Sequence, residues 1–250
     1  MKSYRIAAFA AAAVACTALT GCAQDTPKSV FQNSDEYASR VFVPSALNNS
    51  VQKAVADSKP LTFNKITFTQ NAKVMIQGNP VEWSHDVTYE NAGDGGLIRG
   101  IELDYANGVV EEKEFALSYR GLVSLYVQTI APNSQKMPYP VRTDSVSRFD
   151  TSLDQPTLNY SYQISSNAPK SRTRNRSQSC TLTSTYAASK VAAGIQGDAR
   201  EFSCKFYNDN GVVDANSNVV YLNSYGIVIL KDMTRTTGNV HFTTSNFKVS

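Results

Sequence analysis

Alternation of apolar and polar residues, repeated along most of the chain after residue 60, is the feature that most limits how it can fold. In the segment 83–89, aromatic and aliphatic residues take every second position, and polar residues take the positions between them. The same pattern recurs in 101–105, 115–119 and 158–164. A period of two places successive side chains on opposite faces of a β-strand. Together with the turn signals between them, these segments predict about ten strands and few helices.

Two connections between the predicted strands are informative. Asn107-Gly108, followed by a pair of valines, is the strongest short hairpin signal in the chain, because both residue types tolerate the positive φ of a tight turn. The segment 131–141 contains Pro132, Pro138 and Pro140, and proline cannot donate a ladder hydrogen bond inside a sheet. This segment is therefore either a domain boundary or one long loop across a single sheet.

The expected fold is all-β and antiparallel, with residues 45–250 forming a single domain. Long strands that carry Tyr and Phe on their apolar side favour a strongly curved sheet, an open or half barrel wrapped around its own core. A β-sandwich is the alternative architecture. A short N-terminal helix is expected within 45–58, where Leu47, Val51 and Val55 recur at a spacing of four.

The first residues form a separate unit. An apolar run, Ile6–Leu19, follows two basic residues and is too short for a permanent membrane span, which needs about 20 apolar residues. It ends in Leu19-Thr20-Gly21-Cys22, which resembles the lipobox of bacterial lipoproteins. The resemblance implies that residues 1–21 are a signal peptide and that the thiol of Cys22 is acylated. The alternative is a cleaved secretory leader that carries no lipid.

Acylation of Cys22 would decide where the protein works. Several acyl chains anchor a protein firmly, because each buried methylene contributes about 0.8 kcal/mol. In Gram-negative lipoproteins an Asp after the Cys is associated with retention in the inner membrane, and this chain has Ala23 instead. The resemblance therefore implies the periplasmic face of the outer membrane, with the membrane itself as a partner. Residues 22–44 are expected to form the lipidated N-terminus and a tether to the folded domain.

Two cysteines remain for the folded domain, because Cys16 lies in the predicted leader and Cys22 is assigned to lipid. Cys180 and Cys204 each lie on the apolar side of a predicted strand, in a compartment that oxidises thiols. A disulfide between them is the expected outcome, and it contributes roughly 3 kcal/mol in the chain-entropy model. Two buried free thiols are the alternative. A zinc site is disfavoured, because no CxxC or neighbouring His accompanies either residue.

Charge is distributed unevenly along the chain. Without Lys2 and Arg5 of the leader, the formal charge falls from +3 to about +1, so a nucleic-acid partner is not expected. Between residues 82 and 114 there are nine acids and two bases, a local charge of about −7. These acids alternate with the apolar positions, so we expect them to be solvated on the wet faces of the strands.

The segment 155–197 has no acid and carries the candidate anion-binding residues. They are Lys170, Arg172, Arg174 and Arg176. The alternate spacing of the three arginines points their guanidinium groups in one direction if the segment is extended, which suits the phosphate groups of lipid, lipopolysaccharide or an acidic glycan. The alternative is a mobile, solvated loop, favoured by the neighbouring Ser, Asn and Pro residues.

No catalytic constellation is visible. There is no G-x-S-x-G elbow, and both domain cysteines are assigned to the disulfide. His85 shares the apolar side of its strand and is expected at the core or its rim, with a ligand or base role as the alternative, whereas His241 is expected to face water. Their spacing predicts no metal site or cofactor. Asn208-Asp209-Asn210-Gly211 does not supply the carboxylates of a calcium loop and is expected to be a turn.

Three functions follow from these features. The first is a non-enzymatic lipoprotein, anchored to the outer membrane, that binds an apolar or glycan envelope ligand or a partner protein. The second is a lipid or lipoprotein carrier with a cavity in an open barrel. The third is an envelope glycan hydrolase, whose two carboxylates the sequence does not identify. The anchor, the strand pattern and the missing catalytic motif favour the first.

Overall fold

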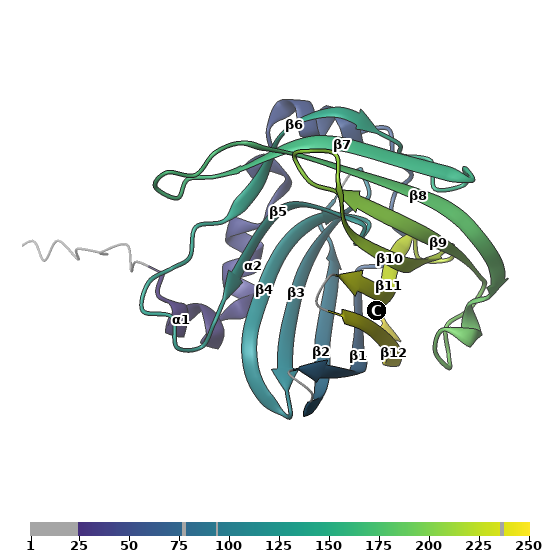
Figure 1. Cartoon of the computed structure of the whole chain (residues 1–250), viewed down its shortest axis with the longest axis horizontal. Helices are drawn as coiled ribbons and strands as arrows, with labels where there is room; N and C mark the ends of the chain where they lie inside the picture. Colours follow the sequence, from purple (N-terminus) through teal and green to yellow (C-terminus); the bar gives the residue numbers. More distant parts are fainter. Residues whose placement is uncertain (1–24, 77–78, 94, 236–237) are drawn as a thin grey trace, which may run out of the picture.

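Antiparallel strands close into a barrel in the computed structural model, which describes residues 25–76, 79–93, 95–235 and 238–250 (Figure 1). The strands follow one another around the barrel in chain order, and β1 pairs with both β2 and β12. The predicted all-β, antiparallel fold is confirmed. The open or half barrel is wrong, as is the β-sandwich, because the last strand returns to the first and closes the sheet. The strands are β1 (Lys65–Ile76), β2 (Asn79–Asn91), β3 (Leu97–Ala106), β4 (Val109–Tyr119), β5 (Val123–Ile130), β6 (Val141–Phe149), β7 (Thr157–Ser166), β8 (Arg174–Ala187), β9 (Asp198–Tyr207), β10 (Val213–Leu222), β11 (Ile227–Arg235) and β12 (Gly238–Val249).

Local turn chemistry sets the connections as expected. Asn107 and Gly108 have φ values of 50° and 77° and join β3 to β4, so the predicted hairpin is confirmed. The segment beginning at Asn208 is also a turn, in which the Asn208 side-chain oxygen accepts hydrogen bonds from the backbone N–H groups of Asn210 and Val212. That oxygen is thereby used within the turn itself.

The thinnest pairing in the described part of the barrel lies between β5 and β6. Only two residue pairs join these strands, Tyr126 with Arg142 and Val127 with Val141. The proline-containing segment 131–140 connects them as a loop, because its prolines cannot continue a ladder. Both strands belong to the same sheet, so the loop connects neighbouring strands of one barrel that are joined by few residue pairs.

Three short α-helices precede the barrel. They are α1 (Pro27–Gln32), α2 (Ser34–Val41) and α3 (Asn49–Val55). The Thr26 side chain caps the start of α1, and the helix predicted within 45–58 is present as α3. Short 3₁₀ turns lie at Pro44–Ala46 and Ala188–Lys190. Within the described ranges, none of the helices is long and apolar enough to cross a membrane.

The helices pack against the strands instead of forming a tether. Figure 1 shows α2 beside the strands β3 to β5. The Tyr37 and Phe42 rings contact Phe115 of β4, with ring centroids 5.1 and 5.9 Å away, and all three side chains are buried. The tether predicted for 22–44 is therefore wrong from Pro27 onward, since burial of these aromatic rings docks the segment onto the barrel.

A buried arginine joins the two sides of the barrel at one end. Arg120, in the turn between β4 and β5, is 2% exposed and donates through Nη1 to the carbonyl of Gly226, 2.8 Å away. Its guanidinium also donates to the carbonyl of Lys59, and its own carbonyl accepts from the N–H of Val228 at 2.7 Å. These hydrogen bonds fix the β4–β5 turn against the start of β11. The buried apolar residues of the described chain form two clusters.

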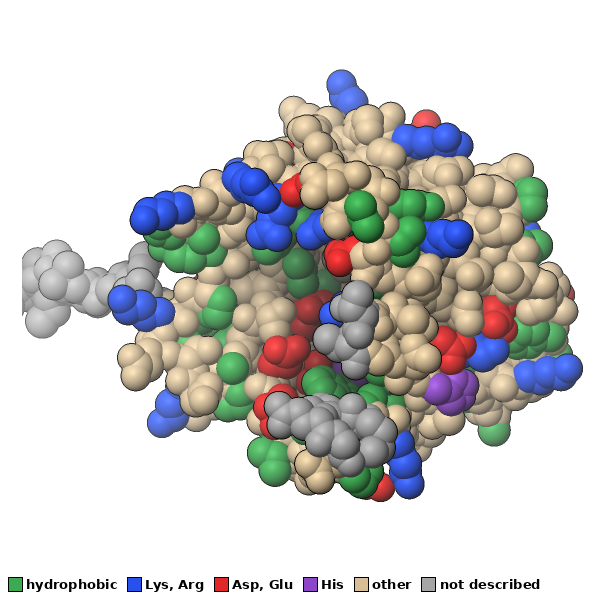
Figure 2. All heavy atoms as spheres, viewed as in Figure 1, with side chains coloured by type: hydrophobic (Ala, Val, Ile, Leu, Met, Phe, Trp, Pro, Cys, Tyr) green, Lys and Arg blue, Asp and Glu red, His purple; other side chains and the backbone are tan. Residues whose placement is uncertain are grey.

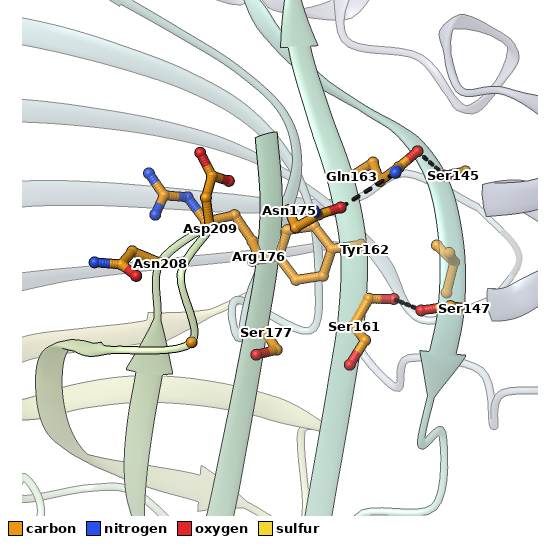
Figure 3. A pocket seen from close by; sticks show the side chains of 12 residues that line it. Ser145, Ser147, Ser161, Tyr162, Gln163, Asn175, Arg176, Ser177, Asn208 and Asp209 are labelled. Atoms are coloured by element: carbon orange, nitrogen blue, oxygen red, sulfur yellow. Dashed lines mark hydrogen bonds between the residues drawn. The ribbon is translucent and has the colours of Figure 1, made fainter. Parts of the chain in front are cut away.

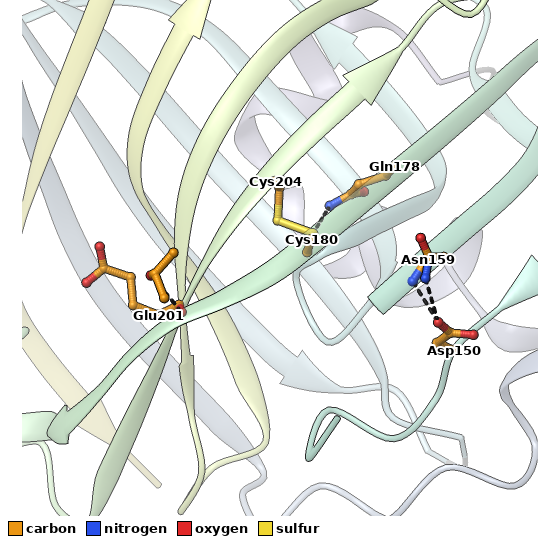
Figure 4. Close-up of a disulfide and its surroundings, with 7 residues drawn as sticks. Asp150, Asn159, Gln178, Cys180, Glu201 and Cys204 are labelled. Carbon is orange, nitrogen blue, oxygen red and sulfur yellow. Dashed lines mark hydrogen bonds between the residues drawn. A yellow bond between two sulfur atoms is a disulfide. The ribbon is translucent and has the colours of Figure 1, made fainter. Parts of the chain in front are cut away.

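The predicted disulfide is confirmed. Cys180 of β8 and Cys204 of β9 lie opposite each other in register and are covalently joined (Figure 4). Both residues are fully buried in the cluster that also contains Leu158 and Phe202. The neighbouring Gln178 side chain donates to the Cys180 sulfur at 3.2 Å. The covalent link therefore ties the two strands together inside the apolar interior.

Candidate binding site inside the barrel

A cavity of about 510 Å³ is lined by residues of every strand from β5 to β11. Val127 lies opposite Val141, and Phe206 lies opposite Ala215. Opposite residues of antiparallel strands share a face, and here that face lines the inside of the barrel, which we call the hollow. The larger apolar residues that line the cavity are Val127, Val141, Tyr162, Ile164, Phe206 and Met233.

Three arginines from separate strands also line this cavity, and we call them the arginine margin. They are Arg142 of β6, Arg176 of β8 and Arg235 of β11. The Nε atom of Arg142 lies 3.3 Å from Asp144, and Nη1 of Arg176 lies 3.6 Å from Asp214. These are long, single contacts, whereas a guanidinium has five N–H donors. Donors therefore remain for an anionic group at the edge of the apolar lining.

The predicted anion-binding residues are only partly brought together. Arg176 lies opposite Tyr162 and lines the cavity, and Arg174 lies opposite Ile164 on the same face, at the exposed start of β8. Lys170 and Arg172 are exposed in the loop before β8 and do not line the cavity. Sequence reasoning missed Arg142 and Arg235, because no local pattern indicates that β6 and β11 approach β8 across the hollow.

A second, more polar cavity of about 460 Å³ adjoins the first and shares Tyr162, Arg176 and Ser177 with it (Figure 3). Hydroxyl and amide groups from β6, β7 and β8 line most of it. Ser145 donates to Gln163 at 3.0 Å, and Gln163 donates to Asn175 at 3.1 Å. Hydroxyl and amide groups are the kind of groups that a glycan would contact. Several of the cavity's side chains, such as Ser145, Gln163 and Asn175, already hydrogen-bond to one another.

The opposite side of the hollow carries a cluster of acids with one histidine, which we call the acidic wall. His85 lies opposite Asp104, Glu102 lies opposite Glu114, and Asp104 lies opposite Glu112. These partners on β2, β3 and β4 share one face. That face continues to the cavity through Ala116, which pairs with Val127. Figure 2 shows acidic side chains inside the central hollow and basic side chains along its upper edge.

Within the acidic wall, His85 and Asp104 form a close pair. The Nδ1 atom of His85 lies 2.6 Å from Oδ1 of Asp104, and the two side chains are 17% and 10% exposed. The hydroxyl of Tyr89 donates to Glu102 at 3.4 Å, and that of Thr129 donates to Glu114 at 3.3 Å. The Trp83 ring stacks on His85 with centroids 5.9 Å apart. The wall is therefore a packed, partly desolvated group of side chains.

Desolvation and mutual repulsion weaken the acidity of this wall. Burial raises the pKa of Glu102, and the charge of Asp104 adds to the rise while His85 opposes it. Burial, followed by the charges of Glu102 and Asp104, raises the pKa of Glu114 to about 8. In the described part of the chain, no Lys or Arg forms an ion pair with Glu102, Glu112 or Glu114.

The expectation that these acids are solvated surface charges is wrong for the acidic wall. Asp104 is only 7% exposed. The physical reason is that β3 and β4 are covered on both faces. Their apolar positions, such as Phe115 and Leu117, face the helix-side cluster, which leaves the acids of the opposite face inside the hollow. Alternation alone cannot distinguish a face that meets bulk water from one that lines a hollow.

The two histidines occur in similar pairs with different surroundings. His85 is half-buried on the same face as Val87 and Tyr89, as expected for the core or its rim. His241 is 62% exposed, as predicted, and its Nδ1 lies 2.6 Å from Asp232. Only His85 has a third potential ligand beside it among the described residues, because its nitrogen and oxygens of Glu102 and Asp104 all lie within 4.8 Å of one another.

Comparison with known proteins adds little. No family model matches the chain, and no curated protein matches its sequence. One solved structure, titled a β-barrel-like protein of the domain of unknown function DUF1849 from Brucella abortus, is similar with a TM-score of 0.46 and 8% identity. The match covers 76% of this chain and 99% of that one. At this level the likeness carries no argument about function, so the site rests on its own geometry.

Proposed function

We propose that this protein is a lipid-anchored envelope protein that binds an anionic amphiphile in the hollow of its barrel. The apolar part of the ligand lies against residues such as Tyr162 and Ile164, and its acidic head group lies on the arginine margin. The observation that carries the proposal is a cavity of about 510 Å³ with an apolar lining and three arginines. Ligand pockets of about 300–1,000 Å³ with a few placed polar groups are typical of small-molecule sites.

An anionic amphiphile fits both the apolar lining and the arginine margin of the cavity better than a neutral apolar molecule or a glycan does. A neutral apolar molecule would leave the arginine margin without a partner, whereas a glycan would place hydroxyl groups against Phe206 and Met233. An acyl chain gains about 0.8 kcal/mol for each methylene that it buries, and its acidic group gains charge-assisted hydrogen bonds. The carrier function uses the same site and adds release to a second membrane.

The anchor at Cys22 and the location on the periplasmic face of the outer membrane are part of the proposal. They depend on Leu19-Thr20-Gly21-Cys22, which lies outside the described residues. Mass spectrometry of the native protein tests them, with an N-terminus at Cys22 carrying acyl chains as the expected result. A bare Cys22 or an uncut leader contradicts the anchor and leaves the binding site to be tested separately.

Ligand binding is tested with the full chain carrying Cys22→Ser, which prevents acylation. A fluorescent long-chain fatty acid is titrated beside the alcohol of equal length. We expect the acid to bind about tenfold more tightly, because charge-assisted hydrogen bonds contribute roughly 1.5–3 kcal/mol. Arg176→Gln should reduce this preference. Arg148→Gln, on the same barrel but outside the cavity and 59% exposed, should not. Equal binding of acid and alcohol, or no binding of either, contradicts the proposal.

A glycan hydrolase is the second candidate, and one observation favours it. Glu102 and Asp104 place carboxylate oxygens within 4.8 Å of each other in the hollow, close to the separation of about 5 Å found in retaining glycosidases. The test is release of reducing ends from isolated envelope glycans. Activity that is lost in Glu102→Gln supports the hydrolase. Absence of release by the unaltered chain removes this candidate.

A further inference from the structure

The register of two strands, β2 and β3, brings together a mixed set of nitrogen and oxygen donors in the acidic wall. His85 of β2 and Asp104 of β3 are cross-strand partners, and Glu102 lies one step along the same face of β3. One donor atom from each side chain lies within 4.8 Å of the other two. Because adjacent strands hold these residues, the donor set is pre-positioned instead of depending on a loop.

The bases of the same charge run do not neutralise this set, because they lie on the opposite face of the sheet. Arg99 donates to the carbonyl of Phe42 and pairs with Glu90 at 3.2 Å. Lys113 donates to the hydroxyl of Ser34 at 2.6 Å, on the helix side. In the described part of the chain, His85 is the only basic group paired with the acids of the wall. Like charges held this close and partly out of water require protons or a cation.

The indole of Trp83 gives an independent sign that the wall takes a polar ligand. Its ring stacks on His85, and its N–H is buried without a hydrogen-bond partner among the described residues. An orphaned buried donor is costly, and ordered water or a ligand group commonly satisfies it. A hydrated cation on His85 brings oxygen-bearing ligands next to this ring.

We propose that His85, Glu102 and Asp104 bind one divalent transition-metal cation in the hollow, at a site separate from the arginine margin. Imidazole nitrogen with carboxylate oxygens suits Zn²⁺ and its neighbours, whereas Ca²⁺ and Mg²⁺ favour oxygen alone. Three protein ligands would leave a position open to water or to a ligand in the hollow. The Nδ1 atom of His85 lies 2.6 Å from Oδ1 of Asp104, so a cation that both side chains bind takes the place of their hydrogen bond.

The chain contains a matched control for this site. His241 and Asp232 form a pair with the same atoms at the same 2.6 Å distance, but they lie on the exposed end of β11 and β12. No third ligand stands beside them among the described residues. If a His–Asp pair alone were sufficient, both pairs would bind the metal equally. If tight binding needs a third ligand, only the His85–Asp104 pair in the hollow binds the metal tightly.

The test uses the Cys22→Ser full chain, stripped with chelator and titrated with Zn²⁺ by calorimetry. We expect one saturable site and an affinity reduced at least about 10- to 100-fold by Asp104→Asn or by Glu102→Gln, because loss of a residue that only supports a metal ligand already costs that much, with no change in Asp232→Asn. Co²⁺ supplies a second readout, because Trp83 is the only tryptophan in the chain and its ring stacks on His85. Co²⁺ should quench its fluorescence, and Zn²⁺ should reverse the quenching.

The outcomes separate the alternatives. Absence of saturable Zn²⁺ binding by the unaltered chain overturns the site, as does binding that Asp104→Asn and Glu102→Gln leave unchanged. Loss of binding in Asp232→Asn would place the metal at the exposed pair and also overturns it. Thermal melts of each variant without metal show whether the fold persists. Asp104→Asn and Glu102→Gln both keep the shape of the side chain, so the site can still be tested if one of the two variants does not fold.

Discussion

The acidic wall and the arginine margin face the same hollow, but they were assembled in different ways. The acidic wall comes from consecutive strands, β2 to β4, and from one charge run between residues 82 and 114. The arginine margin comes from β6, β8 and β11, which lie far apart in the sequence. Pairing of neighbouring strands is therefore enough to bring the acids together. The arginines, in contrast, come together only when strands far apart in the sequence fold into one barrel.

The two regions also differ in how their charge is compensated. Two of the three arginines have a carboxylate within 3.6 Å, whereas none of the four acids of the wall has a Lys or Arg partner in the described chain, and only Asp104 pairs with a histidine. The hollow thus presents cationic donors for an anionic head group and a separate, under-compensated group of acids. One hollow thus carries two groups of opposite charge, and substitutions in each group test whether they act separately.

The largest effect is expected from Arg120, which joins the β4–β5 turn to the start of β11 at one end of the barrel. Arg120→Met leaves the carbonyls of Gly226 and Lys59 without their donor, so we expect a loss of about 3 kcal/mol of unfolding free energy. Urea denaturation measures the loss, with exposed Arg148→Met as the control. If the hollow is one unit, fatty-acid and Zn²⁺ binding weaken together. If only one of the two ligands binds more weakly, the acidic wall and the arginine margin do not depend on each other.

An intermediate effect is expected at high pH on the outer side of the acidic wall. Burial raises the pKa of Tyr37 to about 12, and its hydroxyl donates to Gln128 of β5. The unfolded chain releases this proton near pH 10 and the folded chain near pH 12, so this stability is complete below pH 10 and is lost as pH rises toward 12. We expect a loss of about 2 kcal/mol in alkaline melts.

Tyr37→Phe isolates this contribution from the other tyrosines. The variant cannot ionise at this position, so its stability should fall less steeply between pH 10 and 12 than that of the unaltered chain. Parallel curves for the two proteins would show that the hydroxyl of Tyr37 is as acidic in the folded chain as in the unfolded one. The helix would then dock on this wall without desolvating the ring oxygen.

The smallest change in unfolding free energy is expected from two substitutions, one in each region. Glu114→Gln removes one of several closely spaced carboxylates and keeps its shape, so we expect a gain of about 1 kcal/mol in unfolding free energy at neutral pH. Arg142→Gln changes an exposed side chain and should stay within about 0.5 kcal/mol. Urea denaturation of both variants checks this. A loss of stability in Glu114→Gln would mean that its charge is compensated in the folded chain.

Local features were predictable because their causes are local. Alternation identified most of the strands, and the positive φ values of Asn107 and Gly108 follow from the residue types that tolerate them. The disulfide was predictable because Cys180 and Cys204 each lay on the apolar side of a strand, and strands joined by a short connector pair with each other. The helices α1 and α2 were missed, because their polar residues hide a few buried anchors such as Tyr37.

Local sequence patterns were enough to predict the antiparallel strands, the hairpin turn at Asn107-Gly108, the disulfide and the uneven distribution of charge. The folded chain was needed to show that β12 closes on β1, that Arg142 and Arg235 line one cavity with Arg176, and that Glu102 and Asp104 line a hollow. The physical reason is that periodicity specifies which residues share a face. What that face meets depends on contacts between segments that lie far apart in the sequence, which no local pattern encodes.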